Sequence, residues 1–252
     1  MTEDSSLIKR RLIELAKKSD SGCYFAFTNF LGLAEQSCFN EIKNELRGIS
    51  YSTFGGAVGA ERVIIRFGSP EELGYEENFP IVTLKIAPKS EKFADKLTHR
   101  DFLGSLMNLG IEREMLGDIV IIDNVGYLFA KEEIADYILS SLERIKHTDV
   151  TVSYADALPP GELYKTAPRK IQVSSERLDA VVAKVFSLSR DDAQSFFKRG
   201  LVFVNGKCTE SVSHTPKPDD VISVRGLGRM IYRGFESTSK KGKLNILIDV
   251  YI

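Results

Sequence analysis

The sequence predicts an α+β protein built from three small modules, and three observations support this prediction. The chain has 252 residues, which is enough for two or three small domains. Its middle third shows the element order βαββαβ, which is typical of ferredoxin-like and RNA-recognition-motif-like folds. Between residues 177 and 229, two short helices, a tight turn and a β-ribbon follow one another.

Connectors rich in proline, glycine and polar residues set the expected boundaries between the modules. Pro159-Pro160-Gly161 and Pro168 mark the clearest of these connectors. The expected segments are an N-terminal α+β domain at 1–79, a middle domain at 80–157, a connector at 158–173, a C-terminal module at 174–235, and a linker with a last strand at 236–252.

In the N-terminal domain, apolar spacing predicts helices over 6–18 and 31–46. Segments 51–54 and 62–67 are predicted to pair as a hairpin around the glycine-rich stretch 55–59. That stretch lacks the Lys-Ser/Thr of a phosphate-binding loop and the spacing of a dinucleotide fingerprint, so we expect a turn there.

In the middle domain, the strands and helices can be placed from apolar periodicity and cap residues. Thr98 and Asp101 are spaced to cap a helix start, and Asp123-Asn124 marks a turn. The expected strands are 81–86, 119–122, 127–130 and 150–154, and the expected helices are 98–109 and 131–145.

In the C-terminal module, apolar residues at helical spacing after Ser175 predict a first short helix. Ser189 and Asp192 form a capping pair that opens a second helix, which ends at Gly200. Asn205-Gly206 is the two-residue turn that tolerates positive φ, so it predicts a hairpin. Alternating apolar residues over 244–250 predict a last strand.

The charge of the chain is divided unevenly between its two parts. From Pro168 onward there are 15 Lys and Arg against 9 Asp and Glu, a net charge of +6. The preceding residues carry a net charge of −7, and the overall −1 hides this difference. A basic module on an acidic body indicates one face that binds a polyanion and a body that does not.

The cations of the basic module stand at positions that the pattern places in solvent. For any one of them, an ordinary charged surface is as good an interpretation as a phosphate contact, but their clustering favours nucleic acid. These residues are Arg190, Lys198, Arg199, Lys207, Arg225 and Arg229.

This module resembles the S-four RNA-binding domain, also called the αL motif, over about a quarter of the chain. The resemblance rests on Arg-Leu-Asp at 177–179, Ser-Arg at 189–190, Ala-Gln at 193–194 and Gly-x-Val-x-Val-Asn-Gly-Lys at 200–207. Asp219 departs from the family, which usually has Gly there, although Asp tolerates a left-handed conformation. The resemblance implies that Arg177, Ser189, Gln194 and Asn205 also take part in RNA binding.

Upstream motifs extend the resemblance over essentially the whole chain, to the YlmH family of bacterial and plastid RNA-binding proteins. They are Phe-Gly-Gly-Ala at 54–57, Ala-Glu-Arg at 60–62, Thr-His-Arg-Asp-Phe-Leu-Gly at 98–104, Leu-Gly-Ile-Glu-Arg-Glu at 109–114 and Leu-Gly-Asp-Ile at 116–119. The resemblance implies a non-catalytic protein that acts in ribosome quality control. Its implied partners are ribosomal RNA and tRNA on the large ribosomal subunit.

His99-Arg100-Asp101 invites comparison with a kinase catalytic loop, but the rest of that signature is missing. Position 106 is Leu where the Asn would stand, and no glycine-rich phosphate loop accompanies the triplet. Two interpretations remain. The segment simply caps a helix, or, as the family resemblance implies, His99 and Arg100 contact RNA at the helix start.

Several other classes of protein find no support in the residues. The three histidines, His99, His147 and His214, are far apart, and no Cys or paired carboxylate lies near them at ligand spacing, so we expect no metal. We also expect no cofactor and no small-molecule substrate. No apolar run is long enough for a membrane span, and the polar N-terminus is not a signal peptide. The three cysteines are widely spaced, so we expect them to be packing residues with free thiols in a reducing cytoplasm. We also expect the protein to be a monomer.

Two alternatives to a simple RNA-binding protein stay open. An RNA-modifying enzyme could use the S-four domain to hold its substrate, as pseudouridine synthases do, although the Asp179 of Arg-Leu-Asp lies inside the S-four helix itself. Tyrosyl-tRNA synthetases also carry such a domain, but their nucleotide-binding signatures are absent here. The acidic N-terminal domain could instead bind a protein partner.

Overall fold

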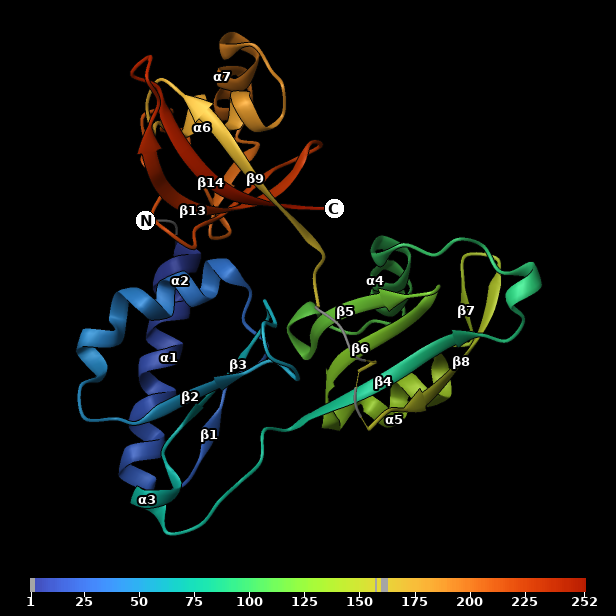
Figure 1. Ribbon diagram of the computed structural model, residues 1–252. Coiled ribbons are helices and arrows are strands. Elements are labelled where there is room, and N and C mark those ends of the chain that lie inside the picture. The colour runs from blue at the N-terminus through green and yellow to red at the C-terminus, as the bar shows by residue number, and fades with distance from the viewer. Residues whose placement is uncertain (1–2, 157, 160–162) are drawn as a thin grey trace. The chain divides into compact units, whose positions relative to one another are not determined.

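The computed structural model describes residues 3–156, 158–159 and 163–252, and Figure 1 shows its ribbon. The chain divides into two compact units, Met1–Leu163 and Tyr164–Ile252. Within the described residues the strands form three separate sheets, of three, six and five strands, and helices pack on each. The predicted α+β class and its modular construction are therefore confirmed.

The first module of the N-terminal unit is a small sheet covered by two helices. It contains α1 (Glu3–Gly22), β1 (Ala26–Phe27), α2 (Leu33–Ile42), the 3-10 turn η1 (Lys43–Leu46), β2 (Tyr51–Phe54), β3 (Ile64–Phe67) and α3 (Pro70–Leu73). The strand order is β1-β3-β2. Leu12 and Phe39 from the helices pack on Ile65 and Phe67 of the central strand. Helix α2 begins later than the pattern predicts because Gly32 caps it, with its N–H donated to Glu35 over 2.6 Å.

The middle module has the predicted element order and closes as a ferredoxin-like sheet. It contains β4 (Ile81–Pro88), the 3-10 turn η2 (Glu91–Phe93), α4 (His99–Asn108), the 3-10 turn η3 (Arg113–Met115), β5 (Leu116–Ile122), β6 (Val125–Lys131), α5 (Glu132–Ser141), β7 (Arg144–Ile145) and β8 (Thr148–Tyr154). The strand order is β5-β6-β4-β8-β7, and every neighbouring pair is antiparallel. Phe102 of α4 and Ile138 of α5 pack with Leu84 and Leu128 on one face of this sheet.

The second helix of this module ends earlier than predicted. Apolar periodicity extends it to residue 145, but α5 stops at Ser141, and Arg144–Ile145 pairs with the start of β8. Lys146 turns this hairpin at a φ of 52°. The buried Leu142 and Ile145 fit the spacing of a helix, yet they reach the core from a helix end and a short strand.

The first and middle modules are joined by motifs that lie far apart in the sequence. The buried carboxylate of Asp118 accepts the backbone N–H groups of Glu61 and Arg62 over 2.6 and 3.3 Å. Arg62 in turn donates to the carbonyls of Phe30 and Leu116 over 2.8 and 2.9 Å. The Ala-Glu-Arg and Leu-Gly-Asp-Ile motifs, which carry part of the family resemblance, therefore form a structural joint.

The C-terminal unit is one six-stranded sheet with two helices on one face. It contains β9 (Thr166–Val173), α6 (Leu178–Val185), α7 (Arg190–Lys198), β10 (Val202–Val204), β11 (Lys207–Cys208), β12 (Val221–Val224), β13 (Gly228–Thr238) and β14 (Leu244–Tyr251). The strand order is β11-β10-β12-β13-β14-β9. The stretch expected as a connector thus supplies an edge strand, and the segment expected as a linker before the last strand forms the end of β13 and the turn between β13 and β14.

The three cysteines are free, but only Cys38 is buried, so the expected packing role does not hold for Cys23 and Cys208, which are exposed. Among the described residues, no helix combines the length and the apolar character needed to cross a bilayer.

Candidate nucleic-acid interface

A buried carboxylate organises the start of the helical pair in the C-terminal unit. Asp179, in the first turn of α6, is fully buried. Arg177 donates to both of its oxygens over 3.1 Å, and the Gln194 amide of α7 donates over 3.3 Å. The guanidinium of Arg190 lies 3.6 Å away, and the backbone N–H of Ala180 completes the set. Three sequence-predicted site residues therefore converge on one acid.

Asp179 stays ionised because its partners outweigh its burial. Burial raises the pKa of Asp179, but the hydrogen bonds from Arg177 and Gln194 and the charges of Arg177 and Arg190 hold that pKa below its ordinary value. The side chains of Arg177 and Arg190 remain about half exposed, at 40% and 54%. Arg177 uses Nε and Nη2 for the acid, so its remaining Nη1 can bind a further anion.

Asp179 was not among the sequence-predicted site residues. The Arg177-Leu178-Asp179 triplet served only as a family signature, and an acid in an amphipathic helix is ordinarily a solvent-facing residue. The signal that could have identified it is its position: Asp179 lies between Leu178 and the apolar Val181 and Val182, on the buried side of the helix.

The remaining cations on the helical side lie at the end of α7 and on the β-ribbon. Lys198 and Arg199 are exposed, and the Arg199 guanidinium lies over the Phe196 ring, 5.7 Å from its centroid. Lys207 of β11 pairs in register with Val204, which packs against the same core as the helices. Lys198 and Arg199 extend the cationic surface away from Arg190 along α7, and Lys207 adds a positive charge on the β-ribbon.

Arg225 and Arg229 lie on the other face of the sheet. In β12, Ile222 and Val224 point into the core, so Ser223 points away from it, and Arg229 pairs with Ser223 and donates to its hydroxyl over 3.2 Å. Arg229 also stacks on Tyr251, and Arg225 stacks on Phe203, at 4.8 and 4.6 Å from the ring centroids. The cations predicted as one cluster are thus divided over two faces.

Two predicted RNA-binding side chains are used within the fold. Ser189 caps α7 by accepting the N–H of Asp192 over 3.0 Å, as its spacing predicts. Asn205, at a φ of 48°, donates to Asp220 over 2.7 Å and accepts the N–H of Val221 over 2.9 Å. Both side chains hold the helical pair and the ribbon in shape, so they position the cations around them.

In the middle module, the predicted cap at the start of α4 is confirmed. Asp101 accepts from the backbone N–H and the hydroxyl of Thr98 over 2.8 and 2.6 Å, and it pairs with Lys146 of the β7–β8 hairpin over 2.8 Å. The hydrogen bond from Lys146 and those from Thr98 lower the pKa of Asp101 to about 2. His99 and Arg100 are exposed beside this cap.

We expect Asp101→Ala and Arg100→Ala to act on different properties. Asp101→Ala removes the cap and the ion pair, so it should lower the melting temperature by several degrees. Arg100→Ala should leave the melting temperature unchanged and weaken binding to ribosomal RNA. Thermal melts and RNA titrations of both variants test this; early melting of Arg100→Ala with normal RNA binding would make Arg100 a structural residue.

The same cap has a pH signature. The pKa of Asp101 is lowered from 3.8, so its contribution to stability is complete above that pH and is lost as the pH falls toward about 2. The difference in melting temperature between the wild type and Asp101→Asn should therefore shrink across that interval. A difference in melting temperature that stays constant over this pH interval would show that the charge of Asp101 does not contribute to stability.

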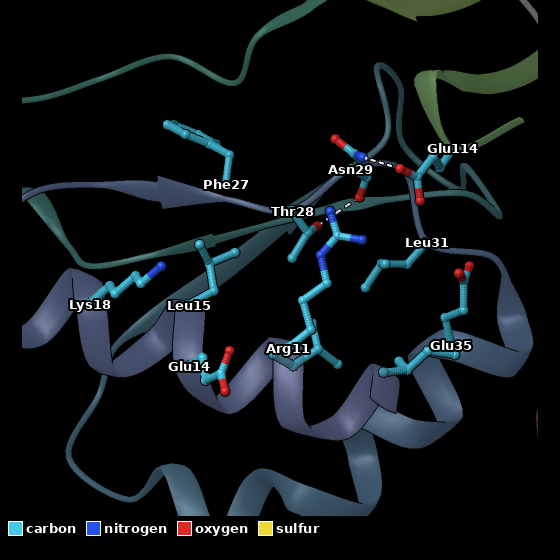
Figure 2. A pocket seen from close by; sticks show the side chains of 12 residues that line it. Arg11, Glu14, Leu15, Lys18, Phe27, Thr28, Asn29, Leu31, Glu35 and Glu114 are labelled. Atoms are coloured by element: carbon cyan, nitrogen blue, oxygen red, sulfur yellow. Dashed lines mark hydrogen bonds between the residues drawn. The ribbon is translucent and has the colours of Figure 1, made fainter. Parts of the chain in front are cut away.

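The first module contains a pocket of about 220 Å³ beside α1. Figure 2 shows Leu15 and Phe27 at one part of its wall, and Arg11 reaching from the helix toward Asn29. The amide of Asn29 donates to Glu114 of the middle module over 2.6 Å. Because Asn29 and Glu114 are hydrogen-bonded to each other, this side of the pocket belongs to the contact between the first and middle modules.

Comparisons of sequence and structure relate this chain to known proteins. Residues 75–158 match the family model described as "Putative RNA-binding domain in YlmH". The chain is 30% identical over 240 residues to "Ribosome-associated protein quality control protein P2" of Bacillus subtilis, and the match covers 88% of this chain and 86% of the relative. A solved structure, "Cell division protein ylmH from Streptococcus pneumoniae", aligns with a TM-score of 0.49 and 22% identity over 62% of this chain and 93% of that one.

The fold and the matched domain define the class as modular α+β proteins that carry an RNA-binding domain. Within this class, the chain belongs to the YlmH family.

Proposed function

We propose that this protein is a non-catalytic RNA-binding protein that holds ribosomal RNA and tRNA on the large ribosomal subunit during quality control of stalled nascent chains. The observation that carries the proposal is the buried Asp179, which anchors Arg177 and Arg190 at the start of an S-four-like helical pair. The B. subtilis relative is named as a ribosome-associated quality control protein, which supports the ribosomal part.

Anchored guanidinium groups suit the recognition of an RNA backbone. Arg presents its donors in a planar fork that matches phosphate, and fixing the fork in advance reduces the entropy lost on binding. Structured RNA is recognised mainly by shape and by backbone contacts. A cationic surface set by Arg177, Arg190 and Lys198 on a rigid helical pair, and by Lys207 on the adjoining β-ribbon, therefore fits folded RNA better than it fits a particular base sequence.

Crosslinking in cells, followed by sequencing of the attached RNA, tests the proposal. We expect fragments of large-subunit ribosomal RNA and tRNA with the wild type, and a strong loss of both with Arg177→Gln/Arg190→Gln. Scattered messenger RNA, or no RNA, would contradict the proposal.

The same cells address the alternative of an RNA-modifying enzyme. Mass mapping of ribosomal RNA and tRNA from a deletion strain should show every base modification intact. A modification that disappears on deletion, and returns with the wild type but not with Asp101→Asn, would replace the binding role by a catalytic one.

A further inference from the structure

The open face of the middle sheet, where RNA-recognition-motif proteins stack bases, is partly covered in this protein. Along β6, Leu128 faces the helices, so Tyr127 and Phe129 face the other side. Phe129 is buried against Phe30 and the first module, and a Cβ atom at Gly56 would lie 2.2 Å from its ring. One of the two aromatic residues on β6 is therefore unavailable to RNA.

A different aromatic residue of the middle module is presented to solvent. Residues 89–97, which we call the lysine loop, connect β4 to α4, and Figure 1 shows this segment projecting past the end of the sheet near β7. Phe93 lies in this loop with 79% of its surface exposed. The ammonium of Lys92 lies 5.5 Å from the centroid of its ring.

The ends of the lysine loop are fixed to the rest of the middle module by hydrogen bonds. The N–H of Lys89 donates to the Asp149 carbonyl over 2.8 Å, and the N–H of Asp95 donates to the buried Thr148 over 2.8 Å. Asn124, at the β5–β6 turn, accepts the N–H of Leu97 over 2.8 Å and donates to the Asp95 carbonyl over 2.9 Å. The loop thus presents Phe93 without an ordering cost at its ends.

Cations flank Phe93 in the loop and at the start of α4, which follows it in the chain. Four of them are exposed and, within the described part of the chain, form no ion pair: Lys89, Lys92, Lys96 and Arg100. Of the two acids in the loop, Asp95 is engaged by His147, through its backbone N–H at 3.2 Å and its ring nitrogen at 3.5 Å. Glu91 is the other, so the loop and the helix start carry an excess of positive charge.

From this arrangement we propose that the lysine loop is a second RNA contact, in which Phe93 stacks on an unpaired base while Lys92, Lys96 and Arg100 hold the flanking phosphates. An exposed aromatic ring among cations is the arrangement that binds single-stranded nucleic acid, because every base offers a face for stacking. A protein-binding surface would instead favour apolar neighbours with depleted lysine. The proposal rests on the proposed function and adds the kind of RNA feature that the middle module recognises.

Titration of the full-length protein with two RNA probes tests the stacking contact. The probes are a 20-nucleotide single strand of mixed sequence and the perfect duplex of the same sequence. Phe93→Ala should lose about tenfold to a hundredfold in affinity for the single strand, the range expected for one stacked base. Its affinity for the duplex should stay within about twofold, since a duplex offers no unpaired base.

Matched variants control for folding and for charge. Phe93→Trp should keep the single-strand affinity, and Leu7→Ala, which shortens another exposed apolar side chain, should leave it unchanged. Lys92→Gln/Lys96→Gln should shift the slope of log affinity against log salt toward zero by about 1.4, at about 0.7 for each contact. Lys17→Gln/Lys18→Gln, the same charge change on α1, should not alter the slope.

The outcomes separate this proposal from the proposed function. Equal single-strand affinity for Phe93→Ala and the wild type would overturn the stacking contact, and the loop would then be available to a protein partner. Failure of the wild type to sediment with large ribosomal subunits would overturn the proposed function, whatever Phe93 does. Loss of single-strand binding in Phe93→Ala would support the stacking contact in either case.

Discussion

Replacing Asp179 by alanine is expected to lower both the stability of the C-terminal unit and its affinity for RNA. The substitution removes a buried carboxylate that accepts hydrogen bonds from Arg177, Gln194 and the Ala180 N–H. The guanidinium groups can turn to solvent, so the cost falls below that of stranding a buried charge. We expect a loss of about 2 kcal/mol, which corresponds to a fall of roughly 10 °C in melting temperature for a unit of this size.

The effect on RNA binding should exceed what the loss of stability explains. Without Asp179, the forks of Arg177 and Arg190 are no longer held in one orientation, and each must be ordered again on binding. RNA titrations at a temperature where the variant is fully folded measure this effect directly. A variant that melts early but binds RNA like the wild type would restrict Asp179 to a structural role.

Asp179→Asn separates the charge of the side chain from its shape. The asparagine side chain fills the same volume as aspartate but offers one neutral oxygen. The Asp179→Asn variant should therefore be more stable than Asp179→Ala, but it should orient the guanidinium groups of Arg177 and Arg190 less well than the wild type does. The pKa of Asp179 is lowered, so its contribution is present above a pH of about 4 and is lost as the pH falls below that value. The stability of the wild type should approach that of Asp179→Asn as the pH falls.

The features that the sequence predicted well are those determined by local chemistry. Asn205-Gly206 and Asp123-Asn124 both form turns at positive φ, as these residue types favour. Asp219, expected in a left-handed conformation where the family has glycine, has a φ of 70°. The order βαββαβ followed from apolar periodicity, a continuous apolar run in β5 and local cap and turn residues, all of which are set by neighbouring residues in the chain.

Strand β9 was not predictable from local signals because its partner lies at the other end of the unit. Val173 pairs with Leu244, and Pro168 lies opposite Asp249 in the same ladder. A proline in a run of residues argues against a central strand but is compatible with an edge strand, which β9 is. The sequence contained the proline, but not the information that this strand would lie at an edge.

For the candidate interface, the sequence predicted which residues would be cations but not which face each would occupy. Arg229 and Arg190 appeared as members of one cluster, yet the register of β12 and β13 turns Arg229 away from the helices. A shift of one residue in that register would reverse this result. Alternation within a strand is visible in a sequence, whereas the side on which the helices pack is decided by the whole core.

Removing two cations on the helical side is expected to weaken RNA binding by a predictable factor. Arg190→Gln/Lys198→Gln takes two charges from opposite ends of α7. Glutamine is preferred to glutamate because an acid at position 190 would stand beside the buried Asp179. As four contacts to flexible RNA, Arg177, Arg190, Lys198 and Lys207 should contribute about −3 to the slope of log affinity against log salt of the wild type, at ~0.7 for each contact.

The double variant should shift that slope toward zero by about 1.4, and counterion release then gives a loss of about 25-fold in affinity at 0.1 M salt. Lys240→Gln/Lys241→Gln, which removes two exposed charges from the β13–β14 turn, is the matched control and should change neither quantity much. If instead the control reproduces the loss, binding follows the overall charge of the unit. The slope could instead stay unchanged in Arg190→Gln/Lys198→Gln and shift toward zero in Arg225→Gln/Arg229→Gln. That result would place the RNA contact on the opposite face of the sheet, where Arg225 and Arg229 stack on Phe203 and Tyr251.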